Sequence, residues 1–197
     1  MPVYADQIDL RHAVASHCGD FTLTDQFKPD LLQAEARLNQ RLRMRQMITD
    51  DTLTFASGEA ALPSDFLEMI NVYDAYRCPM RATSIANVQR SGQQYGRYAI
   101  DGSNVLIYGL TGDRDITYFA KLPTLSTSDT TTNWLLTQYP DIYLYAVAWQ
   151  VLIRAKNVEL AGATKELLED AIKSARVDDE RSRWANGTVN LGSMVTP

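Results

Sequence analysis

The stretch DIYLYAVAWQVLIRAK, Asp141–Lys156, contains the longest apolar run of the chain. It follows Pro140, a residue that is favoured at a helix start because the N–H that proline lacks would have no helical partner there. The apolar side chains of the stretch fall on almost the whole circumference of a helix and not on a single stripe. The stretch therefore predicts a helix that other parts of the chain cover on two sides.

Three further helices are predicted. The segment Tyr4–Cys18 repeats its apolar residues at helical spacing. A second helix, with the clearest amphipathic pattern, runs from near Lys28 to near Arg43, because Pro29 is tolerated only in a first helical turn. A third extends from about Val158 to Trp184. Two predicted helices thus precede the middle of the chain and two follow it.

The middle of the chain changes to a period of two, which is typical of strands. Residues 47–121 are rich in β-branched and aromatic side chains, and turn residues interrupt them, for example at Ser57-Gly58 and Asp101-Gly102. We expect five or six short antiparallel strands. One protruding hairpin is predicted to pair Asn104–Tyr108 with Ile116–Ala120.

The predicted fold class is α+β, a helical bundle of two N-terminal and two C-terminal helices with an inserted antiparallel β-sheet region and an extended C-terminal tail. The helical core is expected to be discontinuous, comprising residues 1–44 and 133–185. The inserted β-rich region covers 45–132, and the tail covers 186–197. The tail contains no charged side chain and is not expected to fold alone.

Composition excludes several classes of protein. The 197 residues are 45% hydrophobic, which is enough for a core, and their net charge of −5 argues against a dedicated nucleic-acid binder. No apolar run reaches the roughly 20 residues that cross a bilayer. The N-terminus lacks the basic and apolar regions of a secretory signal, so we expect the product to stay where it is made, without membrane contact and with reduced cysteines.

No cluster of residues predicts catalysis. His12 and His17 would point about 140° apart on one helix, so they do not suit one metal ion. Asp50-Asp51 would face opposite sides of a strand, and Asp178–Glu180 is read as a solvated run. Gly92–Gly96 is not followed by the Lys-Ser/Thr of a phosphate-binding loop. We therefore expect no enzyme, no metal and no cofactor. A hydrolase that uses the acidic clusters is a third alternative, and it would require metal-dependent activity that is lost on substitution of Asp50 or Asp179.

Two features indicate possible contacts with partners. Guanidinium groups gather near the end of the second predicted helix, where they could meet phosphates or carboxylates or could simply suit a helix C-terminus. They belong to Arg37, Arg41, Arg43 and Arg45. Aromatic residues gather in the predicted helix Asp141–Lys156 and just before it. A subunit interface and a core helix explain them equally well. They are Tyr139, Tyr143, Tyr145 and Trp149.

Four phrases together resemble the head-tail adaptor (connector) proteins of tailed bacteriophages. They are AEARLNQRLR at 34–43, ALPSDFLE at 61–68, NWLLTQYPDIYLY at 133–145 and DERSRW at 179–184. None is a chemical motif, and the resemblance lies in the amino-acid sequences of these segments, their order and their spacing. It extends over most of the chain.

The resemblance implies a structural protein of the virion neck, made in the host cytoplasm. Such a protein would form a ring of twelve subunits beneath the portal protein after DNA packaging. The ring would provide the docking platform for tail or nozzle proteins. Packaged DNA would pass through its channel without sequence-specific binding.

Three sets of residues are candidates for these contacts. The charge-free tail would lie along the portal as an extended strand. Its apolar residues are Val189, Leu191, Met194 and Val195. A subunit interface is expected at Tyr143, Tyr145, Trp149, Arg37 and Arg41. The tail protein is expected to contact Leu110, Thr111, Asp113 and Arg114, together with the loop 125–132.

A different class of function stays open from the sequence. The chain could be a small DNA-associated or regulatory binding module that uses the basic cluster Arg37–Arg45 as its contact face. A steep fall of DNA affinity with salt would favour that alternative.

Overall fold

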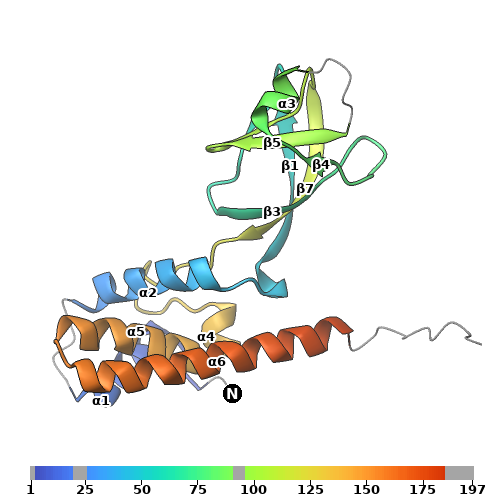
Figure 1. The fold of residues 1–197 in the computed structure, drawn as a ribbon. Helices are drawn as coiled ribbons and strands as arrows, with labels where there is room; N and C mark the ends of the chain where they lie inside the picture. Colours follow the sequence, from blue (N-terminus) through green and yellow to red (C-terminus); the bar gives the residue numbers. More distant parts are fainter. Residues whose placement is uncertain (1–2, 20–25, 91–95, 185–197) are drawn as a thin grey trace, which may run out of the picture. The chain divides into compact units, whose positions relative to one another are not determined.

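The computed structural model describes residues 3–19, 26–90 and 96–184, and they form an α+β fold, as predicted (Figure 1). Contacts within the chain form two compact units, Met1–Met44 with Leu122–Pro197, and Arg45–Lys121. The first unit is helical and the second is rich in strands. Each unit has its own buried residues and is described by itself.

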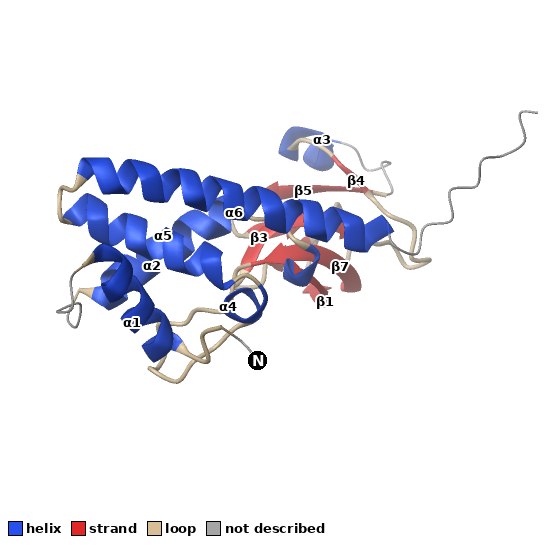
Figure 2. Ribbon diagram, turned by 90° about the horizontal axis from the view of Figure 1, so that it is seen from below, coloured by secondary structure: helices blue, strands red, loops and turns tan. Residues whose placement is uncertain are grey.

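The helical unit is arranged around α5. Its helices are α1 Gln7–Cys18, α2 Phe27–Arg41, α4 Trp134–Gln138, α5 Pro140–Arg154 and α6 Val158–Trp184. Helix α5 packs against α1, α2, α4 and α6, and Figures 1 and 2 show it lying alongside α6. Ile142, Val147 and Ala148 are almost completely buried in it. The helix that is apolar all round is thus covered on several sides.

Local capping sets the helix ends. Helix α1 begins at Gln7 and not at Tyr4, because the Asp6 side chain accepts hydrogen bonds from the Ile8 and Asp9 N–H groups and so marks the N-cap. It ends at Cys18, and the C-cap residue Gly19 follows with a φ of 68°, in the left-handed region that suits glycine. Helix α2 begins one residue before Lys28 and stops at Arg41, two residues before the predicted Arg43, because Leu42 is already extended.

The β-rich unit contains two sheets. Its elements are the 3-10 turn η1 Arg45–Met47, β1 Ile48–Phe55, β2 Glu59–Ala61, β3 Phe66–Val72, β4 Arg81–Ala82, α3 Ile85–Arg90, β5 Arg97–Asp101, β6 Asn104–Leu106 and β7 Gly112–Ala120. One sheet has the order β1-β7-β3 and the other β2-β6-β5-β4. The pair β4–β5 is parallel, so the prediction that all strands are antiparallel was wrong for that pair.

The predicted hairpin between Asn104–Tyr108 and Ile116–Ala120 does not form. Strand β7 pairs with β1 and β3, whereas β6 pairs with β2 and β5. The reason is Gly58, whose N–H donates to the Leu110 carbonyl and whose carbonyl accepts from the Ile107 N–H, each over 2.8 Å. These bonds tie the segment after β6 to the β1–β2 turn, and the chain crosses to the other sheet.

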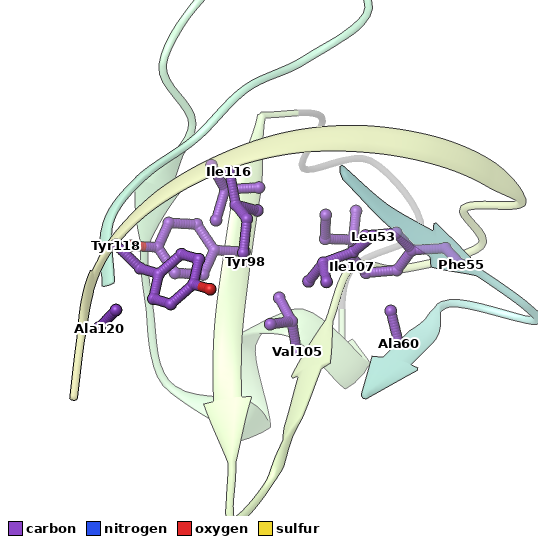
Figure 3. Close-up of a cluster of buried hydrophobic side chains, with 10 residues drawn as sticks. Leu53, Phe55, Ala60, Tyr98, Val105, Ile107, Ile116, Tyr118 and Ala120 are labelled. Atoms are coloured by element: carbon purple, nitrogen blue, oxygen red, sulfur yellow. The ribbon is translucent and has the colours of Figure 1, made fainter. Parts of the chain in front are cut away.

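Buried side chains from both sheets meet in one cluster (Figure 3). Its members are Leu53, Phe55, Ala60, Val72, Tyr98, Val105, Ile107, Ile116, Tyr118 and Ala120. Each sheet contributes alternate residues of its strands, which is the pattern expected when one face of a strand is buried. The cluster gives the β-rich unit a core of its own.

The return from the β-rich unit is held by Glu35, a buried carboxylate of α2. Its oxygens accept hydrogen bonds from the Leu125 N–H over 2.7 Å, the Thr124 hydroxyl over 2.6 Å and the Tyr143 hydroxyl over 3.3 Å. Asn39 on the same helix accepts from the Leu122 N–H over 2.8 Å. The segment after Lys121 therefore belongs with the helices, whereas the sequence placed it in the inserted region up to residue 132.

Burial raises the pKa of Glu35, and the hydrogen bonds from Thr124, Leu125 and Tyr143 oppose that rise. A carboxyl whose pKa is higher in the folded state favours folding most at low pH. This contribution is lost as pH rises from the ordinary carboxyl pKa of about 4.3 through the raised folded value.

The variant Glu35→Gln removes this titration. We expect the free energy of unfolding of the unmodified chain, relative to Glu35→Gln, to fall as pH rises through that window and then to level off. Denaturant unfolding at a series of pH values measures this difference. Glu35→Ala, which leaves several buried donors without an acceptor, should be less stable by about 2–4 kcal/mol. A relative stability that instead rises over the window would contradict the assignment.

Candidate interaction surfaces

A hollow on the helical unit brings together α2, α5 and α6. It has a volume of about 270 Å³, and its lining residues are Ala34, Arg37, Leu38, Gln40, Arg41, Ala146, Trp149, Gln150 and Leu168. Trp149 of α5 is half-buried there. The guanidinium carbon of Arg37 lies 4.4 Å from the centroid of the indole, and the Lys165 Nζ atom lies 5.9 Å from it. Two cations from different helices thus flank one aromatic ring.

The basic residues around this hollow differ in how they are used. Arg41 forms an ion pair with Glu169 of α6, and this pairing lowers the pKa of Glu169. The Arg41 carbonyl also accepts a hydrogen bond from Arg176 over 2.6 Å. Arg37 and Lys165 form no ion pair with any other residue in the described part of the chain. They are therefore the cations that remain available to a partner.

The aromatic residues predicted for a subunit interface lie in three different environments in the structure. Tyr143 is 0% exposed, and its hydroxyl donates to Glu35 and accepts from Asn133. Its inclusion in the interface was wrong, because it lies inside the core of its own chain. Tyr145 is half-buried and stacks edge-on against His17, with the ring centroids 5.7 Å apart. Trp149 is the aromatic residue that the structure joins to Arg37 and Arg41.

The residues predicted at the tip of a protruding hairpin occupy other positions. Leu110 is half-buried against the core of the β-rich unit. Asp113 and Arg114 are strand residues of β7, opposite Thr54 and Leu53. Thr111 is exposed in the short connection before β7. The structure thus leaves Thr111 and Asp113 exposed, but not on a hairpin tip.

Carboxylates and hydroxyls alternate on the open face of β1 and β7. The Thr52 hydroxyl donates to Asp115 over 3.0 Å, and the Thr117 hydroxyl donates to Asp50 over 2.6 Å. These cross-strand bonds hold Asp50 of β1 and Asp115 of β7 on the solvated face of the two strands. Across residues 3–19, 26–90 and 96–184, no group of three His, Cys, Asp or Glu side chains could hold a metal ion.

Sequence reasoning missed the connection between β3 and β4. It presents Tyr76 and Arg77, which are among the most exposed large side chains that the structure describes. The signal was available in Asp74 and Pro79, since aspartate and proline are turn residues. The sequence of the neighbouring strands, however, does not distinguish this turn from the other predicted turns.

The apolar tail residues predicted to bind the portal lie outside the described part of the chain. They are Val189, Leu191, Met194 and Val195. Within the described residues, no helix has the length and apolarity that a membrane span requires.

The described parts of the chain combine a two-unit α+β fold with candidate interaction surfaces. A family model described as SU10 adaptor protein matches residues 6–192. The chain belongs to this family of phage head-tail adaptors, which confirms the resemblance seen in the sequence. No curated protein matches the chain.

Membership of the family gives the chain a structural adaptor role in a bacteriophage virion. The family is not typically enzymatic. An adaptor interacts with other head and tail proteins of the phage. The surfaces described above are therefore read as candidates for protein contacts.

Proposed function

We propose that the chain forms a ring, of twelve subunits, beneath the portal protein in the neck of the virion. The ring provides the platform for tail or nozzle proteins, and packaged DNA passes through its channel without sequence-specific binding. The observation that carries this proposal beyond the family is the surface at Trp149, where Arg37 and Lys165 flank an accessible indole without an ion-pair partner among the described residues.

The surface at Trp149 suits a contact with a different patch of a neighbouring copy. Contacts between two different patches close into a ring when the rotation between copies allows it. Tryptophan and arginine are enriched among the residues that dominate interface energies. Arg41, held by Glu169, and Tyr145, one helical turn from Trp149, border this surface. A carboxylate of the neighbouring copy would complete it.

Charge reversal at Arg37 tests the ring contact. We expect Arg37→Glu to keep the free energy of unfolding of the isolated chain within about 0.5–1 kcal/mol, because Arg37 is exposed. Ring formation with the portal protein should be lost, as seen by electron microscopy of the mixture. Lys28→Glu makes the same charge change on the same helix at another exposed position and should form rings normally. Normal rings with Arg37→Glu would refute this interface.

We further propose that the tail binds the portal through Val189, Leu191, Met194 and Val195. The support is compositional: residues 186–197 carry no charged side chain and spread their apolar residues over a length that an extended strand could present. Main-chain hydrogen bonds to the portal would offset the entropy lost when the tail becomes ordered.

Truncation tests the tail. Deletion of 186–197 should abolish binding to purified portal protein, while the thermal unfolding midpoint of the chain stays within a few degrees of the full-length value. A full-length variant with Asn190→Asp and Ser193→Asp is the companion test, since it keeps the length but adds charge. Portal binding that survives truncation would rule out this role of the tail.

The contact with the tail protein is proposed to include Leu110, Thr111, Asp113 and Arg114, together with the loop 125–132. Thr111 and Asp113 supply the exposed part of the first group. Cross-linking that maps the tail protein only to the helices would contradict this contact.

The alternative of a DNA-binding face at Arg37–Arg45 is weakened by the way its arginines are used. Arg41 is paired with Glu169, and Arg43 donates to the carbonyls of Asn39 and Leu42 over 2.8 and 2.6 Å. Guanidinium groups committed within the chain are less available to phosphates. DNA binding that falls steeply with salt would restore the alternative.

A further inference from the structure

The connection between β3 and β4 is a loop with several hydrogen bonds of its own (Figure 1). The Asp74 carboxylate accepts hydrogen bonds from the Tyr76 and Cys78 N–H groups, each over 2.8 Å. The Asp74 N–H donates to the Cys78 carbonyl over 2.9 Å, and Tyr73 forms a β-bridge with Pro79. One carboxylate thus organises the whole turn.

The loop displays two side chains that it does not use. Tyr76 is 88% exposed, and the side chain of Arg77 is 85% exposed. Single exposed apolar residues are ordinary on protein surfaces. Here, however, Arg77 has a φ of 59°, a conformation that non-glycine residues rarely adopt and that persists only where surrounding bonds hold it. The turn therefore holds Tyr76 and Arg77 outward at an energetic cost.

A hollow of about 670 Å³ lies beside the loop. Its lining residues are Asp50, Asp51, Thr52, Tyr73, Arg77, Asp115, Ile116 and Thr117. Three of these residues are aspartates and one is an arginine, and the Arg77 guanidinium lies 3.6 Å from the Asp115 carboxylate. The hydrogen bonds of Asp50 and Asp115 with the neighbouring threonines keep this wall in place. The hollow is acidic, so it repels phosphates and attracts cationic side chains.

We propose that Tyr76 and Arg77 form a docking finger for another protein, whose surface offers an apolar socket for the tyrosine ring beside lysine or arginine side chains that enter the acidic hollow. This inference rests on the proposed function and names its partner as the tail or nozzle protein. A ring would use the helical surface at Trp149, so the finger on the β-rich unit remains for a different chain. Tyrosine and arginine suit this role because they dominate interface energies, and a pre-formed turn lowers the entropy lost on binding.

A photo-cross-linker placed on the finger identifies what it touches. We expect Tyr76→p-benzoylphenylalanine, in virions assembled with the full chain, to cross-link to a tail or nozzle protein whose cross-linked peptide contains Lys or Arg. Cross-links to a second copy of this chain, to the portal or to DNA would overturn the proposal, as would the absence of any cross-link.

Attachment of purified tails to heads that carry variant chains gives the energetic test. We expect Tyr76→Ala to reduce attachment at least about tenfold. Asp74→Ala keeps both finger residues but releases the turn, so it should reduce attachment about three- to tenfold. Tyr108→Ala removes another exposed tyrosine of the same unit and should attach normally. Normal attachment with Tyr76→Ala, or loss confined to Tyr108→Ala, would overturn the finger.

The amount of each variant in purified heads distinguishes a failure of the finger from a failure of the proposed function. Variants that enter heads in normal amount and fail only at tail attachment support the finger. If the unmodified chain itself were absent from heads, the proposed function would fail, and the partner named for the finger would fail with it. Circular dichroism and unfolding of each variant show whether the β-rich unit stays folded.

Discussion

The helical unit depends on a carboxylate that is buried among its helices. Glu35 sits on α2, and its hydrogen bonds reach both the returning segment 122–125 and Tyr143 of the central helix. A buried carboxylate is costly unless its oxygens are fully hydrogen-bonded, and here three donors converge on it. The network continues through Asn133, which donates to the Tyr143 hydroxyl and caps α4. One side chain therefore fixes where the chain re-enters the helices.

A second buried carboxylate of α2, that of Asp30, binds the other end of α5. Asp30 accepts two-pronged hydrogen bonds from Arg154, with the Nη2–Oδ2 distance at 2.9 Å. Arginine suits this arrangement because its planar fork matches the carboxylate. Since Asp30 and Glu35 lie more than a helical turn apart on α2, they fix both the position and the rotation of α5 against it. Apolar packing alone would leave a helix such as α5, apolar nearly all round, less firmly oriented.

Periodicity predicted the helices well because their signals are local. Pro140, the apolar circumference of α5 and the stripe of α2 all act within a few turns of chain. Strand pairing failed where a distant residue decided it: no local pattern near Asn104–Tyr108 reveals that Gly58 will bind Ile107 and Leu110. In the same way, the burial of Tyr143 follows from Glu35, more than a hundred residues away in sequence. The sequence pointed to Trp149 and Arg37, but the contribution of Lys165 needed the packing of α6.

The distribution of charge affects how strongly the chain could bind DNA. Several arginines are committed within the chain, as in the pairs Arg41–Glu169, Arg154–Asp30 and Arg183–Asp179. The formal net charge is −5, and the open face of β1 and β7 carries carboxylates held by threonines. Phosphate binding needs several accessible cations together, and these pairings remove some of the candidates. In the proposed ring, the net negative charge would disfavour adhesion to DNA, and Arg37 and Lys165 at Trp149 would serve the proposed contacts between proteins.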